Sequence, residues 1–160
     1  MKKTEMAIVG IVALIAIVAL GSIAAATSSS DGGNEKNVTL DGITFNIPDG
    51  YKIMDNYTVD NETDATDQGS KYLFNERGYN NSEGKEFQVA VVSFINEEDF
   101  GIVDVTAALI GDEKTVNGVD GYMSGSEKRF TLFAYVAGEG KMVLITAEDP
   151  NLFEDIVVPN

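Results

Sequence analysis

The chain has 160 residues with 26 acidic and 11 basic side chains, a formal net charge of −15, and neither cysteine nor histidine. The two absences exclude disulfides, thiolate chemistry, lipid attachment to cysteine and every site that needs an imidazole, including a Ser-His-Asp triad. The negative charge disfavours nucleic-acid binding, because a basic surface is what attracts phosphates.

Residues 6–26 form a long uncharged apolar segment near the N-terminus. As a helix rising about 1.5 Å per residue, this segment is long enough to cross the hydrocarbon core of a bilayer. Lys2 and Lys3 precede it, and no basic residue follows until Lys36, so the positive-inside rule keeps the N-terminus in the cytoplasm. We therefore expect residues 1–26 to be a signal-anchor of a single-pass cell-membrane protein whose remainder lies outside.

The end of the same segment also fits a cleavable signal peptide. Ala24, Ala25 and Ala26 supply the small residues of a cleavage site before Thr27. The alternative is thus a protein secreted after cleavage near Ala26, and the sequence leaves the choice open. Both alternatives export an acidic product, because residues 1–26 carry a net charge of +1 and the rest of the chain −16.

Residues 27–36 (TSSSDGGNEK) predict a flexible linker, and residues 37–160 predict one extracytoplasmic domain. The first element of that domain is a hairpin, in which Asp41-Gly42 forms the turn between strands 38–40 and 43–47. Its apolar residues alternate with polar ones and are candidates for the core: Leu40, Ile43, Phe45 and Ile47.

The acidic segment 54–69 has no sustained periodicity, which predicts a long exposed loop. Four of its acids have the spacing of alternating calcium ligands: Asp60, Glu62, Asp64 and Asp67. However, Ala65 stands where a calcium loop needs glycine, and Lys71 where it needs the bidentate glutamate. We therefore expect a solvated loop and assign no metal ligand.

The middle of the domain predicts two strands and a helix. Residues 71–74 and 86–94 have strand patterns, and the second is apolar on both faces, as in a central strand. Between them, residues 78–84 are rich in turn formers. Residues 96–110 predict a helix with Asn96 as its cap and Gly111 as its end. The apolar face of this helix contains Phe100, Val103, Ala107 and Ile110.

Two further hairpins and a short helix complete the domain. Asn117-Gly118 joins strands 114–116 and 119–123, and the turn at 138–140 joins strands 129–137 and 141–147. Asp149 caps a helix over residues 150–157. The expected fold is α+β: a predominantly antiparallel sheet built from hairpins, flanked by one internal helix and a short C-terminal helix, plus the N-terminal transmembrane helix.

Few residues suggest chemistry, and we predict neither a catalytic constellation nor a cofactor or metal site. Ser82 and Lys85 have the S-x-x-K spacing of serine acyl-enzymes but fall in a turn, where the lysine is solvated. Four tyrosines near turns are candidates for a binding surface: Tyr51, Tyr57, Tyr79 and Tyr122. Four asparagines lie in N-x-[ST] glycosylation sequences: Asn37, Asn56, Asn61 and Asn80.

Three segments carry a resemblance to known proteins: FNIPDGY at 45–51, TVNGVDGY at 115–122, and Phe130 to Tyr135 followed by GKMVLIT at 140–146. With them the chain resembles small, N-terminally anchored surface proteins of methanogenic archaea, and its element order resembles PsbP/Mog1-like domains. The resemblance covers about residues 38–158 and consists of turn and core residues. It implies an α+β domain used for binding or assembly, and it transfers no functional residue.

The expected function is a non-catalytic, membrane-anchored interaction module of the cell envelope. Its expected partners are the membrane, through the N-terminal helix, and an envelope or membrane protein; nucleic acid is not among them. The alternative is a ligand- or cation-binding accessory subunit of a membrane complex that uses the acidic segment 54–69. A hydrolase working with carboxylates alone needs two facing acids in a cleft, and no feature of the sequence indicates such a pair.

Overall fold

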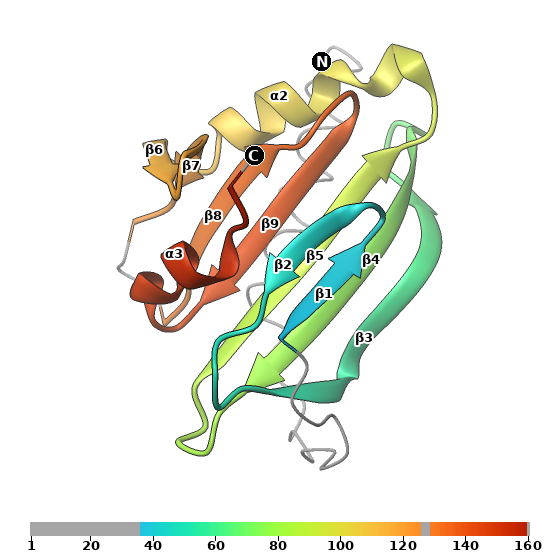
Figure 1. Ribbon diagram of the computed structural model, residues 1–160. Coiled ribbons are helices and arrows are strands. Elements are labelled where there is room, and N and C mark those ends of the chain that lie inside the picture. Colours follow the sequence, from blue (N-terminus) through green and yellow to red (C-terminus); the bar gives the residue numbers. More distant parts are fainter. Residues whose placement is uncertain (1–35, 126–128, 160) are drawn as a thin grey trace.

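The computed structural model describes residues 36–125 and 129–159, which fold around a seven-stranded sheet (Figure 1). The spatial order of the strands is β3-β4-β5-β9-β8-β7-β6, and every neighbouring pair is antiparallel. The strands are β3 (Lys52–Ala65), β4 (Lys71–Asn80), β5 (Glu86–Phe94), β6 (Asp112–Val116), β7 (Val119–Met123), β8 (Thr131–Val136) and β9 (Lys141–Ala147). A separate hairpin contains β1 (Asn37–Leu40) and β2 (Ile43–Asn46), and the helices are α2 (Gly101–Ala108) and α3 (Phe153–Ile156). The predicted α+β class with a predominantly antiparallel sheet is confirmed.

The predicted signal-anchor at 1–26 and nearly all of the predicted linker, residues 27–35, lie outside the described residues. Within residues 36–125 and 129–159, none of the helices has the length and apolar character needed to cross a bilayer. Lys36, the last residue of the predicted linker, already belongs to the folded part, because its carbonyl accepts a hydrogen bond from the Ile47 N–H at 2.9 Å.

The turn dipeptides fold as their sequences predict. Asp41 and Gly42 have φ angles of 45° and 84°, and Asn117 and Gly118 have φ angles of 49° and 82°. Two consecutive left-handed residues form the tight turn whose twist matches that of a hairpin. The predicted hairpins 38–47 and 114–123 are therefore confirmed, as is the third, in which the Ala137 N–H donates to the Lys141 carbonyl at 3.0 Å.

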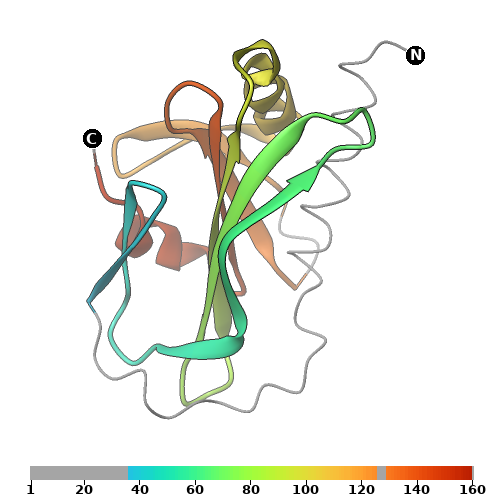
Figure 2. The ribbon, with the colours of Figure 1, turned by 90° about the vertical axis from the view of Figure 1, so that its right-hand side faces the viewer.

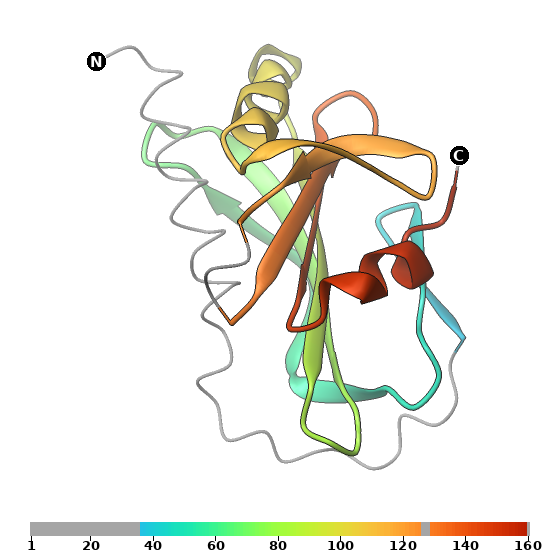
Figure 3. The same ribbon diagram turned by 90° about the vertical axis from the view of Figure 1, so that its left-hand side faces the viewer.

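The sheet is covered on both faces, as the two nearly edge-on views show (Figures 2 and 3). The β1–β2 hairpin and α3 lie on one face, and α2 lies on the other. The first face buries the larger apolar cluster, which includes Leu40, Phe45, Phe87, Val89, Val91, Phe133, Val143, Ile145, Phe153 and Ile156. The α2 face buries a second cluster, which includes Tyr72, Ala90, Val92, Phe94, Ile102, Val103, Ala107, Met142 and Leu144.

Strand β5 is buried along its whole length and pairs with β4 on one side and β9 on the other, so the prediction of a central strand is confirmed. The predicted helix 96–110 is confirmed as a 3₁₀ turn at Glu97–Asp99 followed by α2. Asn96 does not cap it with its side chain; its carbonyl instead accepts the Asp99 N–H at 2.9 Å. Val103 and Ala107 are fully buried on the predicted face.

The predicted C-terminal helix over 150–157 is also confirmed, as a 3₁₀ turn at Pro150–Leu152 that continues into α3. The Asp149 carboxylate caps it by accepting the Asn151 N–H at 2.9 Å. Val157 then pairs with Phe45 of β2, which joins the C-terminal segment to the first hairpin.

The prediction of an exposed loop over 54–69 is wrong, because most of this segment belongs to edge strand β3. The polar pattern of this segment does not indicate a strand, because β3 is irregular. Met54 pairs with Gly78 and Val59 with Glu76, so β3 advances five residues where β4 advances two. Such bulges break the alternation from which a strand is recognised. Strand β4 likewise extends beyond the predicted 71–74 to Asn80.

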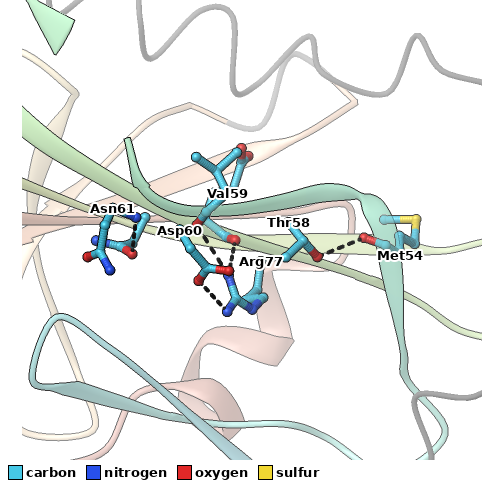
Figure 4. Close-up of polar contacts among 8 residues, drawn as sticks. Met54, Thr58, Val59, Asp60, Asn61 and Arg77 are labelled. Carbon is cyan, nitrogen blue, oxygen red and sulfur yellow. Dashed lines mark hydrogen bonds and ion pairs between the residues drawn. The ribbon is translucent and has the colours of Figure 1, made fainter. Parts of the chain in front are cut away.

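Arg77 of β4 holds the irregular part of β3 in place (Figure 4). Its Nη1 donates to the Val59 carbonyl at 3.2 Å, and its Nη2 contacts the Asp60 carboxylate at 2.6 Å. Next to them, the N–H of Asn61, which has a φ of 49°, donates to Asn75 Oδ1 at 2.9 Å. Side chains of β4 thus replace the backbone pairs that the bulges remove.

Candidate functional site: a groove beside α2 and a split in the sheet

The β6–β7 hairpin separates from the sheet close to the point where it joins. β7 pairs with β8 at only two positions, Tyr122 with Ala134 and Met123 with Phe133. At the next residue, Gly121, a Cβ atom would lie 2.4 Å from the Ala134 carbonyl oxygen, so only glycine fits this bend. Beyond it the hairpin reaches across toward the C-terminal end of the chain (Figure 3). A split therefore opens between β7 and β8.

The far end of the hairpin is fixed to the opposite face of the sheet. Val116 and Val119, which flank its turn, are buried in the larger apolar cluster. Between them, Asn117 Nδ2 donates to the Val157 carbonyl at 2.8 Å. The split is consequently maintained by packing and by a hydrogen bond.

Two adjoining concavities lie between the split and helix α2. The first, of about 460 Å³, is lined by Asp104, Glu113, Lys114, Thr115, Asp120, Gly121, Tyr122 and Val136. The second, of about 580 Å³, is lined by Glu97, Phe100, Gly101, Asp104, Val136, Gly138, Glu139 and Gly140. Asp104 and Val136 line both concavities, so the two adjoin, and we call them together the α2 groove.

The α2 groove is strongly acidic. The described residues of its lining supply one ammonium group, from Lys114, and five carboxylates, from Glu97, Asp104, Glu113, Asp120 and Glu139. One of the carboxylates is oriented by a neighbour, because Thr115 Oγ1 donates to Asp120 Oδ1 at 2.6 Å. Phe100, Tyr122 and Val136, each half-buried, add apolar surface. Carboxylates beside apolar surface suit long cationic side chains, which carry a charged end on an aliphatic stem.

Among the residues that the structure describes, the split leaves part of β8 without a neighbour on one side. Ser124 N–H donates to the Leu132 carbonyl at 2.9 Å on the side of β8 that faces β7. Peptide groups alternate in direction along a strand, so those of Val136, four residues on, also face away from β9. The β7–β8 pairing ends at Ala134, and Val136 is paired with Met142 of β9 alone in the part of the chain that the structure describes. The N–H and C=O of Val136 therefore lie at an open sheet edge.

Val136 is accessible from the other face as well. A third concavity, of about 470 Å³, lies over the β1–β2 turn and the end of β8, and its lining includes Gly42, Tyr135, Val136 and Val158. The open end of β8 is thus bordered by concavities on both faces of the sheet, as expected where a strand is missing from a sheet.

A charged cluster lies away from the groove, where β5 begins and β9 ends. Arg129 Nε contacts Glu148 Oε1 at 2.6 Å, and Arg129 Nη2 contacts Glu86 Oε2 at 3.2 Å. Burial raises the pKa of Glu86, although Arg129 opposes that shift. Burial would raise the pKa of Glu148 too, but hydrogen bonds from Arg129 and from the Glu86 N–H lower it overall. This cluster joins the two strands and stabilises their ends.

A buried carboxyl group lies on the α2 face of β4. Glu76 is 8% exposed, and burial raises the pKa of its side chain to about 7. Gln88 and Thr146, which are 1% exposed and opposite each other on β5 and β9, line the same face. Thr146 Oγ1 lacks a hydrogen-bond partner among the described residues. Of these three residues only Glu76 titrates, and its buried carboxyl makes the stability of the fold depend on pH.

The four tyrosines proposed as a binding surface are not brought together. Tyr57 and Tyr79 are core residues, 7% and 1% exposed, so that prediction is wrong for both. Tyr51 packs edge-on against Phe87 at 5.0 Å between ring centroids. Tyr122 lines the α2 groove. Tyr57 and Tyr79 lie in the core because β3 and β4 are longer than their sequence patterns suggest.

The remaining sequence candidates lie apart from the groove. Ser82 and Lys85 are exposed in a turn that Asn81 closes by accepting the Lys85 N–H at 2.9 Å, as the sequence predicts. Three of the asparagines in glycosylation sequences are exposed and Asn80 is half-buried, so their modification stays a prediction. The acids of β3 do not converge: within the described residues, no set of three or more acids is placed to hold a metal ion.

Apart from Tyr122, sequence reasoning proposed none of the groove residues for a binding surface. Glu113 and Asp120 are polar positions of a hairpin, and Asp104 is an exposed position of a helix, all with ordinary sequence patterns. These three acids line one concavity because β7 diverges from β8. The local sequence feature that marks this divergence is Gly121. Comparison of the chain with protein-family models, curated proteins and solved structures found no match.

Proposed function

We propose that this protein is a non-catalytic interaction module that binds a basic segment of a partner protein in the α2 groove. The observation that carries the proposal is the composition of the groove, whose described residues supply five carboxylates and one ammonium group beside apolar surface. Its two adjoining concavities offer room for several residues of a peptide, whereas a single ion would need a compact set of ligands.

Electrostatics favours a cationic partner at long and at short range. The chain as a whole has a formal net charge of −15, which attracts a basic protein from a distance and accelerates encounter. In the groove, Asp104, Glu113 and Asp120 then pair with lysine or arginine side chains. The half-buried Tyr122 and Val136 contact the stems of these side chains and exclude water from the pairs.

The proposed location of the protein follows from the apolar segment 6–26. A signal-anchor at residues 1–26 keeps the domain at the outer side of the cell membrane, so the partner is an envelope or membrane protein with an exposed basic segment. Cleavage near Ala26 would release the same module. The alternative role as a ligand- or cation-binding accessory subunit is less favoured, because the segment 54–69 that it uses is largely strand and not a loop.

A binding measurement tests the proposal. The probe is the peptide Ac-Lys-Val-Lys-Val-Lys-Val-Lys-NH₂, titrated by calorimetry into the full-length protein in non-ionic detergent. In the groove variant Asp104→Asn, Glu113→Gln and Asp120→Asn are combined. The control variant combines Asp55→Asn, Asp67→Asn and Glu83→Gln, which removes the same charge at exposed positions outside the groove.

We expect the groove variant to bind the peptide about tenfold more weakly, because each lost charge pair contributes roughly 0.5 kcal/mol. The control variant should differ from wild type by less than about twofold. Raising the salt concentration should weaken wild-type binding and reduce the difference between the variants. Equal weakening in both variants, or no binding by the wild type, contradicts the proposal.

A further inference from the structure

The α2 groove contains a backbone edge as well as charges. Val136 lines both concavities of the groove, and its N–H and C=O lie on the side of β8 that β7 has left. Exposed edges of this kind pair with an added strand, which gives main-chain hydrogen bonds to the incoming chain. The concavity on the opposite face at Tyr135 and Val136 leaves room for side chains that an added strand would direct to that side.

We infer that the partner segment binds as an extended strand in the split between β7 and β8, with one of its residues paired to the backbone of Val136. This inference rests on the proposed function and specifies the conformation of the bound segment. The occupant is a lysine- or arginine-bearing peptide segment, because the groove on the α2 face is acidic.

The split is held in place by contacts within the fold. Asn117 and the buried Val116 and Val119 hold the β6–β7 hairpin against the opposite face. The close contact of Gly121 with the Ala134 carbonyl fixes where the two strands diverge. Binding therefore does not have to open the sheet, and the ordering cost falls mainly on the peptide.

Alternation along the bound strand determines which contacts form. If one residue of the guest pairs with Val136, the peptide groups of the next residue face away from β8. The guest residue paired with Val136, and the residues two positions before and after it, direct their side chains to the α2 face, toward Asp104 and Glu139. The guest residues between them direct their side chains to the other face, near Tyr135. A peptide that alternates lysine with valine matches this arrangement.

Amide hydrogen exchange in the bound state provides the test. The same Lys/Val peptide is added at saturation to ¹⁵N-labelled full-length protein in non-ionic detergent, and the exchange rates of single amides are measured by NMR. We expect the Val136 N–H to exchange at least tenfold more slowly when the peptide is bound. The Ala137 N–H is the internal control, because it already donates to the Lys141 carbonyl, and its rate should not change.

Two N-methylated peptides supply a second measurement. One carries the methyl group on the nitrogen of its central valine and the other on the nitrogen of the adjacent lysine. Only one of the two nitrogens faces β8, so we expect about a tenfold loss of affinity for one peptide and little loss for the other.

The outcomes separate this inference from the proposed function. If the unmodified peptide binds but Val136 exchanges at its free rate, or both methylated peptides bind equally, the strand is refuted while charge-driven binding in the groove stands. If no peptide binds, both fail. Slower exchange at Val136 together with unequal effects of the two methyl groups supports the added strand.

Discussion

Asn117 Nδ2 donates a hydrogen bond of 2.8 Å to the carbonyl of Val157, and this contact joins the tip of the β6–β7 hairpin to the C-terminal segment. The two residues lie forty positions apart in the sequence. Because Val157 also pairs with Phe45, the hairpin tip, the C-terminal segment and the first hairpin form one connected layer over the sheet. The split beside β8 depends on this layer.

Replacing Asn117 by glycine should loosen the hairpin without breaking its turn. Glycine accepts the φ of 49° at this position, so the main loss is the hydrogen bond to Val157. We expect the free energy of unfolding to fall by about 1–2 kcal/mol and amides of β7 to exchange faster. Asn117→Asp keeps the shape but cannot donate, and should lose at least as much; unchanged denaturant midpoints for both variants would contradict this role.

Gly121→Ala should damage the fold where the split begins. Its Cβ would lie 2.4 Å from the Ala134 carbonyl oxygen and 2.9 Å from the Phe133 ring, so β7 would have to move. We expect a loss of more than about 2 kcal/mol in thermal or denaturant unfolding. Gly101→Ala is the matched control, because open space surrounds Gly101 at the start of α2 and alanine favours a helix by about 0.5–1 kcal/mol. Similar stabilities for the two variants would refute the steric argument.

Glu76 should make the protein less stable as the pH rises. Its pKa is raised from 4.5 to about 7 by burial, so between these values the folded protein holds a proton that the unfolded chain has released. Stability therefore falls from about pH 4.5 to pH 7 and then levels off, by about 3 kcal/mol in all. Glu76→Gln lacks this change, so it should gain on wild type by roughly 2–3 kcal/mol between pH 5 and pH 8. Urea unfolding of both proteins at pH 5 and at pH 8 measures this gain. If the free energies of unfolding of Glu76→Gln and wild type differ by the same amount at both pH values, the prediction is wrong.

Arg77→Met should free the irregular part of β3. The variant removes the hydrogen bond to the Val59 carbonyl and the ion pair with Asp60. We expect faster proteolysis between residues 55 and 63, with only about 1 kcal/mol lost in global stability. Asp60→Asn is the control: it removes an ion pair whose acid is 61% exposed, and should cost less than about 0.5 kcal/mol. Equal cleavage of both variants would show that the ion pair, and not the backbone contact, holds the strand.

The sequence was sufficient to predict the parts of the fold that depend on local chemistry. Asp41-Gly42 and Asn117-Gly118 specify turns through their left-handed backbone, and the Asp149-Pro150 pair marks the start of a helix. The apolar run 89–92 in β5 indicated the central strand, because burial on both faces favours apolar residues at successive positions.

The rest depends on contacts between distant residues. Strand β3 has the sequence pattern of a loop, because its bulges break the alternation and its stabilising side chain, Arg77, lies on another strand. The α2 groove could not be predicted, since Asp104 and Asp120 meet only through the divergence of β7 from β8. Residues with ordinary surface patterns acquire a role there from tertiary geometry alone.

The long edge strand β3 has a consequence for self-association. An outer strand of 14 residues could stack with identical copies and build a fibre. Its bulges and its exposed acids, such as Asp60 and Glu62, disrupt the flat, uncharged ladder that stacking requires. The bulges and the acids therefore disfavour pairing between identical molecules along this edge strand.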